Sequence, residues 1–147
     1  MLFRSADAKG LLKAAVRSPN PVVYLEHKGL YGLKGEVPEG DHVVPIGQAD
    51  TVRRGDDVTV VAWQRMVHRA LEAAERLEAD GVSVEVIDPR GVRPLDLDTI
   101  LASVRRTGRL VVVHEAPKPG NPANEVAAAV AEDAVDYLAA QIGRAHV

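Results

Sequence analysis

The pattern of hydrophobic and polar positions is most regular from Val58 onward. Apolar runs of strand length alternate with stretches whose apolar side chains recur at helical spacing, and short turns separate them. The expected order is strand Val58–Trp63, helix Arg65–Ala79, strand Val82–Ile87, helix Pro94–Arg106, strand Leu110–Val113 and helix Asn124–Leu138. Asp96 is placed to cap the second of these helices. Strands that alternate with helices predict an α/β fold with parallel strands and right-handed crossovers.

The first third of the chain predicts a separate piece of structure. Asp7–Arg17 carries a helical apolar stripe with Asp7 placed to cap it, and the apolar segment Val22–Leu25 predicts a short buried strand. One helix and one strand cannot bury both of their faces, so this strand needs further sheet neighbours. Residues 28–56 lack periodicity and are rich in Gly and Pro, which predicts an extended connection between domains. We therefore divide the chain into 6–27, 28–56 and 57–140.

The composition narrows the class of protein. Hydrophobic residues make up 46% and charged residues 27%, as in ordinary soluble globular proteins. The net charge of −3 gives no electrostatic case for nucleic acid or an anionic membrane, and no apolar run approaches the roughly 20 residues that span a bilayer. The absence of cysteine excludes disulfides and thiolate metal sites. Together these features predict a cytoplasmic protein that binds neither nucleic acid nor membrane.

The two ends of the chain carry a different signal. Ile142–Val147 matches the translation of the start of a common short-read sequencing adapter, and Met1–Ser5 matches the translation of its reverse complement. Two matches in opposite orientations predict that both segments are adapter sequence read as protein, whereas native termini would match only by coincidence. On this hypothesis Ala6 to about Ala140 is authentic, and the last domain is truncated before its final strand.

Several segments carry a resemblance to a known family, and they follow the family's order over essentially all of residues 7–140. The segments are Asp7–Arg17 (DAKGLLKAAVR), Pro21–His27 (PVVYLEH), Lys34–Asp41 (KGEVPEGD), Pro45–Gly47 (PIG), Asp57–Val61 (DVTVV), Met66–Ala74 (MVHRALEAA), Val84–Pro94 (VEVIDPRGVRP) and Thr107–Ala116 (TGRLVVVHEA). In these segments the chain resembles the β subunit of the E1 component of thiamine diphosphate-dependent 2-oxo acid dehydrogenases, of the pyruvate, branched-chain or acetoin type.

The resemblance implies a transketolase C-terminal-like domain, preceded by the last helix and strand of a pyrimidine-binding domain. It implies oxidative decarboxylation of a 2-oxo acid with acyl transfer to a lipoyl group. The implied partners are an E1 α subunit, a second β subunit and a lipoyl acyltransferase (E2) core. Thiamine diphosphate and magnesium would be held by the full heterotetramer. This fragment is therefore expected to be inactive alone and to carry no catalytic or cofactor-binding residue.

The turn after the first helix is the most site-like part of the chain. By resemblance, the main-chain carbonyls of Ala15, Val16, Ser18 and Asn20 would hold a monovalent cation such as K⁺. A helix C-terminus presents unpaired carbonyl groups with partial negative charge, which suits such an ion. Ser18 stands where Asp is common in the family, which keeps the carbonyl but removes any side-chain role. An ordinary helix stop is the alternative.

His114 and Glu115 follow the third parallel strand, at the edge where open α/β sheets usually bind ligands. They form a candidate acid–base pair, but we favour a histidine that shapes a subunit contact.

Two other functions stay open. One is a transketolase-type synthase such as 1-deoxy-D-xylulose-5-phosphate synthase, against which PVVYLEH, KGEVPEG and TGRLVVVHEA argue. The other is a free-standing, non-catalytic interaction domain, which a closed sheet and native ends would support.

Overall fold

The structure is a computed structural model, and it describes residues 4–146. Within this range five strands form one sheet in the order β1-β3-β2-β4-β5. The strands are β1 (Asp50–Arg53), β2 (Val58–Ala62), β3 (Val84–Asp88), β4 (Leu110–His114) and β5 (Gly143–His146). Strands β2 to β5 pair in parallel, whereas β1 is an antiparallel edge strand beside β3. The predicted α/β fold with a mainly parallel sheet is confirmed.

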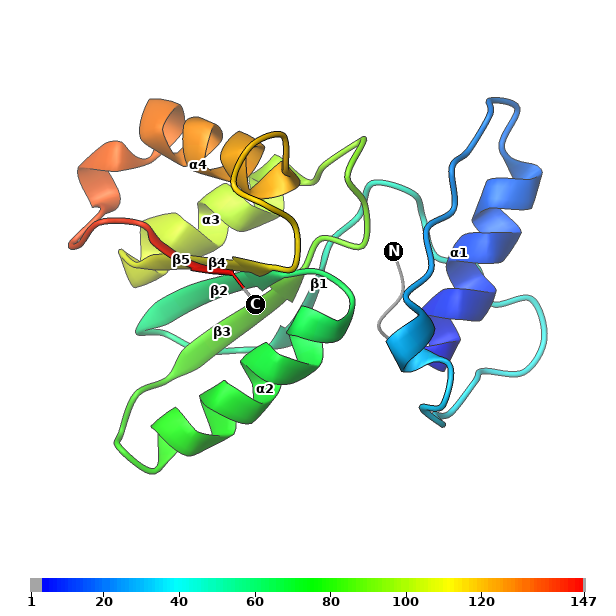
Figure 1. Cartoon of the computed structure of the whole chain (residues 1–147), viewed down its shortest axis with the longest axis horizontal. Helices are drawn as coiled ribbons and strands as arrows, with labels where there is room; N and C mark the ends of the chain where they lie inside the picture. The colour runs from blue at the N-terminus through cyan, green and yellow to red at the C-terminus, as the bar shows by residue number, and fades with distance from the viewer. Residues whose placement is uncertain (1–3, 147) are drawn as a thin grey trace.

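Helices cover both faces of the sheet, and one helix stands apart from it (Figure 1). The helices are α1 (Ser5–Arg17), α2 (Arg65–Glu78), α3 (Leu97–Thr107) and α4 (Pro122–Asp133), with the 3-10 turns η1 (Lys28–Leu30) and η2 (Val135–Tyr137). α2 packs on one face, and α3 and α4 pack on the other. None of the helices in residues 4–146 combines the length and the apolar character needed to cross a membrane.

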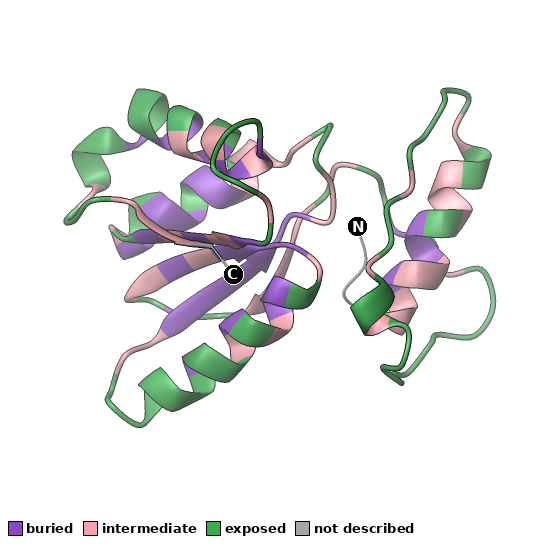
Figure 2. Cartoon of the chain, in the orientation of Figure 1, coloured by how far each residue is buried: buried purple, intermediate pink, exposed green. Residues whose placement is uncertain are grey.

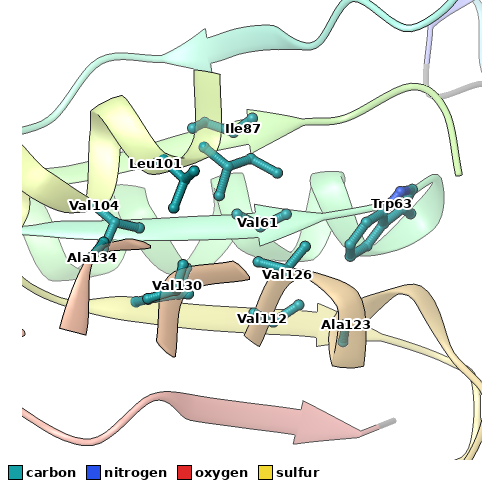
Figure 3. Packing of buried hydrophobic residues seen from close by; sticks show 12 residues of the cluster. Val61, Trp63, Ile87, Leu101, Val104, Val112, Ala123, Val126, Val130 and Ala134 are labelled. Carbon is teal, nitrogen blue, oxygen red and sulfur yellow. The ribbon is translucent and has the colours of Figure 1, made fainter. Parts of the chain in front are cut away.

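The core follows from the alternation of side chains along the strands. Val61, Ile87 and Val112 point to the face covered by α3 and α4, where they meet side chains such as Leu101 and Val126 (Figure 3). The opposite face packs Val84 and Val86 against α2. Figure 2 shows buried residues concentrated in the sheet and on the inner faces of its helices, whereas the connections around α1 are largely exposed. The sheet and its helices therefore form the stable body of the chain.

A buried polar cluster ties α3 to the sheet. Ser103 donates to the Glu85 carboxylate at 2.6 Å, and the Thr59 hydroxyl lies 2.6 Å from that of Ser103 and 2.7 Å from that of Thr107. Arg106 approaches the same carboxylate at 2.7 Å. Because Glu85 is only 1% exposed, these partners offset the cost of removing its charge from water.

The N-terminal third departs from the sequence prediction. Val22–Leu25, expected as a strand, forms no strand among the described residues, because a strand needs a neighbour and none pairs with it. The connection expected over residues 28–56 contains β1, a polar segment that pairs with the edge of β3. Asp7 is not a helix cap: α1 begins at Ser5 with Arg4 in the N-cap position, and Asp7 lies buried in the first turn.

The C-terminal segment also differs. The last helix ends at Asp133 instead of Leu138, where Arg105 donates to the Asp133 carbonyl at 3.1 Å and η2 follows. Gly143–His146, within the segment that the sequence analysis assigns to adapter sequence, forms β5 and pairs in parallel with β4. Strand pairing uses main-chain groups, so an extended segment can occupy the open edge of β4 whatever its side chains.

Candidate functional site

The predicted cation ligands lie together at the end of α1. The Ser18 N–H donates to the Ala15 carbonyl at 3.2 Å, and the Asn20 N–H donates to the Ser18 hydroxyl oxygen at 3.2 Å. Pro19 has no N–H, so it removes the donor that would normally bond the Ala15 carbonyl in a continued helix. The turn thus leaves carbonyl groups with few internal donors, which is the feature that a cation site would need.

Three of these four residues also line one groove. Ala15, Ser18 and Asn20 border a groove of about 550 Å³ between the end of α1 and the loop after β3. Val16 is not among the lining residues, and its side chain is 78% exposed. Within residues 4–146 no group of three or more His, Cys, Asp or Glu side chains is placed to hold a metal ion. Any cation bound at this turn would therefore depend on carbonyl and hydroxyl oxygens.

The predicted His114–Glu115 pair is separated by the fold. His114 is buried at the end of β4, whereas Glu115 faces the N-terminal third and accepts a hydrogen bond from Nε2 of His27 at 2.8 Å. The Gly29 N–H donates to Nδ1 of the same ring at 3.0 Å, which assigns the ring proton to Nε2. Sequence reasoning missed His27 as a partner, because 88 positions separate it from Glu115.

Further charged side chains gather between α1 and the sheet, and the sequence analysis did not predict them as a group. Arg90, in the loop after β3, approaches Asp7 of α1 at 2.7 Å and Asp50 of β1 at 3.1 Å. Arg4 also pairs with Asp7, at 2.9 Å, and with Asp50. We call Asp7, Asp50, Asp88 and Arg90 the Arg90 cluster. The one available signal was that Asp7 and Arg90 both belong to segments that carry the family resemblance.

Asp88 completes the Arg90 cluster at the end of β3. It is fully buried, and its Oδ1 accepts the Arg90 N–H at 2.9 Å. Burial is the main cause that raises the pKa of Asp88 to about 7; the nearby Asp7 carboxylate acts in the same direction, whereas the Arg90 N–H and guanidinium oppose the rise. Asp50 lies opposite Asp88 in the β1–β3 pairing. A carboxyl group with a pKa near 7 changes charge in the physiological range.

The loop that carries Arg90 has an uncommon backbone conformation and is held by Trp63. Arg90 has φ of 58°, a left-handed conformation that is uncommon for a residue with a side chain. The indole N–H of Trp63 donates to the carbonyl of Gly91 at 3.1 Å, and Trp63 is only 4% exposed. On the other side of the groove, the Tyr24 hydroxyl donates to the Ala8 carbonyl at 2.8 Å, and burial raises the pKa of Tyr24 to about 12.

Comparison with known proteins identifies the domain. Residues 47–147 match the family model described as "Transketolase, C-terminal domain". This range includes every strand of the sheet and the helices α2, α3 and α4.

Curated relatives match almost the whole chain. It is 52% identical over 136 residues to acetoin:2,6-dichlorophenolindophenol oxidoreductase subunit beta of Cupriavidus necator, covering 92% of the chain and 40% of the relative. It is 52% identical over 139 residues to 2-oxoisovalerate dehydrogenase subunit beta of Bacillus subtilis, covering 94% and 42%. It is 50% identical over 139 residues to pyruvate dehydrogenase E1 component subunit beta of Staphylococcus epidermidis, covering 94% and 43%. The chain spans about two-fifths of the length of these relatives.

A solved structure shares the fold. A split-gene transketolase, described as an inactive beta4 tetramer, matches with a TM-score of 0.66 and 31% identity over 77% of this chain and 36% of that one. The sheet order, the domain model and the β-subunit relatives agree with one another. The chain belongs to the transketolase C-terminal domain family, and the resemblance of its segments to the β subunits of 2-oxo acid dehydrogenases is confirmed.

Proposed function

We propose that this chain is the C-terminal part of the β subunit of a thiamine diphosphate-dependent 2-oxo acid dehydrogenase. One observation carries the proposal. The β-subunit relatives match at about 50% identity over more than nine-tenths of the chain, whereas the general transketolase-type domain covers only residues 47–147. The likeness therefore includes α1 and the connection, which a shared C-terminal domain alone would not explain.

The proposed reaction is the oxidative decarboxylation of a 2-oxo acid with transfer of the acyl group to a lipoyl group. Thiamine diphosphate would supply the electron sink for the decarboxylation. In this proposal the full heterotetramer holds thiamine diphosphate and Mg²⁺, and we assign no step of the chemistry to this chain. Its role would be to make contacts with an α subunit, a second β subunit and a lipoyl acyltransferase core. A cytoplasmic location is part of the same proposal.

Two observations keep other functions in consideration. The likeness to split-gene transketolase favours a transketolase-type enzyme as the second candidate. The closed packing of the sheet between α2 and the α3–α4 layer would also suit a free-standing interaction domain. Neither candidate accounts for the match of residues before 47 to β subunits.

A chimera tests the proposal. Residues 7–140 would replace the matching segment of the Bacillus subtilis 2-oxoisovalerate dehydrogenase subunit beta, and the chimera would be produced together with its α subunit. We expect the α subunit to copurify and the complex to oxidise 2-oxoisovalerate with an artificial electron acceptor. A matched chimera that carries the split-gene transketolase segment is the control, and we expect it not to assemble. Failure of the first chimera to bind the α subunit, or equal assembly of both, would overturn the proposal.

The cation site is a separate proposal for the turn at residues 15–20. We expect K⁺ to slow amide hydrogen exchange in this turn relative to tetramethylammonium at equal ionic strength, because a bound ion would order the carbonyls of Ala15, Val16, Ser18 and Asn20. In the variant Pro19→Ala a new N–H competes for the Ala15 carbonyl, so the K⁺ effect should shrink. The control is Pro38→Ala in the connection. Equal exchange in both salts would count against the site.

A further inference from the structure

Beside the link between α1 and the sheet lies a buried acid, Asp88, whose Oδ2 accepts no hydrogen bond from any described residue. We infer that Asp88 and Arg90 form a proton-controlled latch, which holds α1 against the sheet when Asp88 is protonated and loosens when Asp88 ionises. This inference is independent of the proposed enzyme activity, since it concerns only contacts within the chain.

Arg90 is the part of the latch that reaches α1. Its guanidinium lies 2.7 Å from the Asp7 carboxylate, and both side chains are largely buried, with 13% and 2% exposure. Figure 1 shows α1 set apart from the sheet and its helices, joined to them through extended segments. Arg4, at the N-cap of α1, also pairs with Asp50 of β1, and His27 bonds Glu115. Because the Arg90–Asp7 ion pair is shielded from water, its strength depends on the charges around it.

Asp88 is the part of the latch that responds to protons. Its Oδ1 accepts the Arg90 N–H, which helps to hold the backbone of Arg90 in the left-handed conformation. Its Oδ2 is buried and has no hydrogen-bond partner among the described residues. A neutral carboxylic acid tolerates such a position, whereas a carboxylate with an unpaired buried oxygen does not.

Ionisation of Asp88 changes the balance of charge around Arg90. Among the described residues, Asp7 from α1 and the guanidinium of Arg90 act on the charge of Asp88, and Asp50 of β1 lies opposite Asp88 in the strand pairing. Arg4 pairs with Asp7 and Asp50 from a position that is 42% exposed. With Asp88 ionised, a third carboxylate competes for Arg90 and repels Asp7. Since burial raises the pKa of Asp88 to about 7, this change falls between pH 6 and pH 8. We therefore expect α1 to be held more firmly at the lower pH.

The chain contains its own reporter for the loop. Trp63 is the only tryptophan, and its indole N–H bonds the carbonyl of Gly91, the residue after Arg90. A change in the loop should therefore alter tryptophan emission. Histidines are the other side chains that change charge between pH 5 and pH 8, and His27 links the same two parts of the chain. A test must separate Asp88 from His27.

The test uses the complete 147-residue chain. Hydrogen exchange of α1 amides, corrected for intrinsic rates, and Trp63 emission would be followed from pH 5.5 to pH 8.5. We expect the corrected α1 exchange rate to rise about tenfold, with a midpoint near pH 7, and emission to follow it. Asp88→Asn keeps an oxygen for the Arg90 N–H but cannot ionise, so both transitions should vanish. The matched control Asp98→Asn removes an exposed carboxylate, and both transitions should remain in this variant.

Three results would overturn the latch. The first is a wild-type chain whose α1 exchange does not change with pH. The second is a transition that persists in Asp88→Asn, which would assign it to a histidine. If Asp88→Asn does not fold, carbon NMR of the aspartate carboxyl groups in the wild-type chain shows whether an aspartate titrates together with α1 exchange. A carboxyl resonance that titrates together with α1 exchange supports the latch, and the absence of one above pH 6 is the third contrary result.

Discussion

The approach of the chain at Gly55 to the start of β3 is so close that no side chain fits between them. A Cβ added at Gly55 would meet the carbonyl carbon of Val84 and the amide nitrogen of Glu85, and it would lie 2.5 Å from the Val84 oxygen. All three are main-chain atoms of a central strand, so they cannot rotate away as a side chain would. Gly55→Ala must therefore shift either β3 or the segment that leads into β2.

The structure allows the cost of that shift to be estimated. Overpacking in a well-packed region costs about 1–3 kcal/mol. The shift would also disturb the hydrogen bond from the Asp57 N–H to the Ser83 carbonyl, at 2.8 Å, and the bond from Arg106 to the Gly55 carbonyl, at 2.7 Å. Each bond is worth about 1 kcal/mol net. We expect a total loss of about 3–5 kcal/mol, which corresponds to a fall in Tm of about 6–20 °C for a chain of this size.

Urea unfolding followed by Trp63 emission measures this loss, because Trp63 is 4% exposed in the folded chain and becomes solvated on unfolding. The matched control is Gly32→Ala, where nothing lies within 4 Å of the added Cβ. That variant should be neutral, or more stable by about 0.4–1 kcal/mol through a less flexible unfolded chain. A loss below about 1 kcal/mol in Gly55→Ala, or an equal loss in both variants, would refute the steric reasoning.

Three further predictions concern the interior. Ser103→Ala should cost about 1–3 kcal/mol in urea unfolding, because the buried Glu85 carboxylate loses a donor at 2.6 Å. Trp63→Phe should lower the Tm measured by circular dichroism by about 2–6 °C, since the Gly91 carbonyl loses its donor. The third concerns pH. The folded pKa of Asp88 lies above its ordinary value, so the stabilisation it gives is complete below about pH 4 and is lost as the pH rises through about 7. Urea unfolding should therefore show stability falling from pH 5 to pH 8, and Asp88→Asn should flatten that slope.

The central part of the fold was predictable because its signals are local. Apolar runs and helical spacing located β2, α2, β3, α3 and β4 to within a few residues. Asp96 caps α3 as predicted, since its carboxylate accepts a hydrogen bond from the Thr99 N–H at 3.1 Å. These elements bury one or both faces against near neighbours in sequence. Their periodicity therefore carries enough information to place them.

The edges of the sheet were not predictable in the same way. β1 is a polar segment whose strand conformation comes from pairing with β3, and β5 forms by pairing with β4. Val22–Leu25 shows the converse, since an apolar strand-like segment forms no strand without a neighbour. Because β5 depends on main-chain pairing, its presence does not test whether Ile142–Val147 is native. Sequencing of the source DNA across both ends tests that prediction.

The sequence by itself determined the α/β class, the order of the central elements and the resemblance to β subunits, because each depends on patterns read within short stretches. Only the tertiary structure decided which polar groups meet. Asp7, Asp50, Asp88 and Arg90 lie on three elements and a loop, and the fold brings them together. Charge interactions depend on distance in space and on burial, and neither follows from spacing along the chain. The buried acid with a pKa near 7 is therefore a property of the fold.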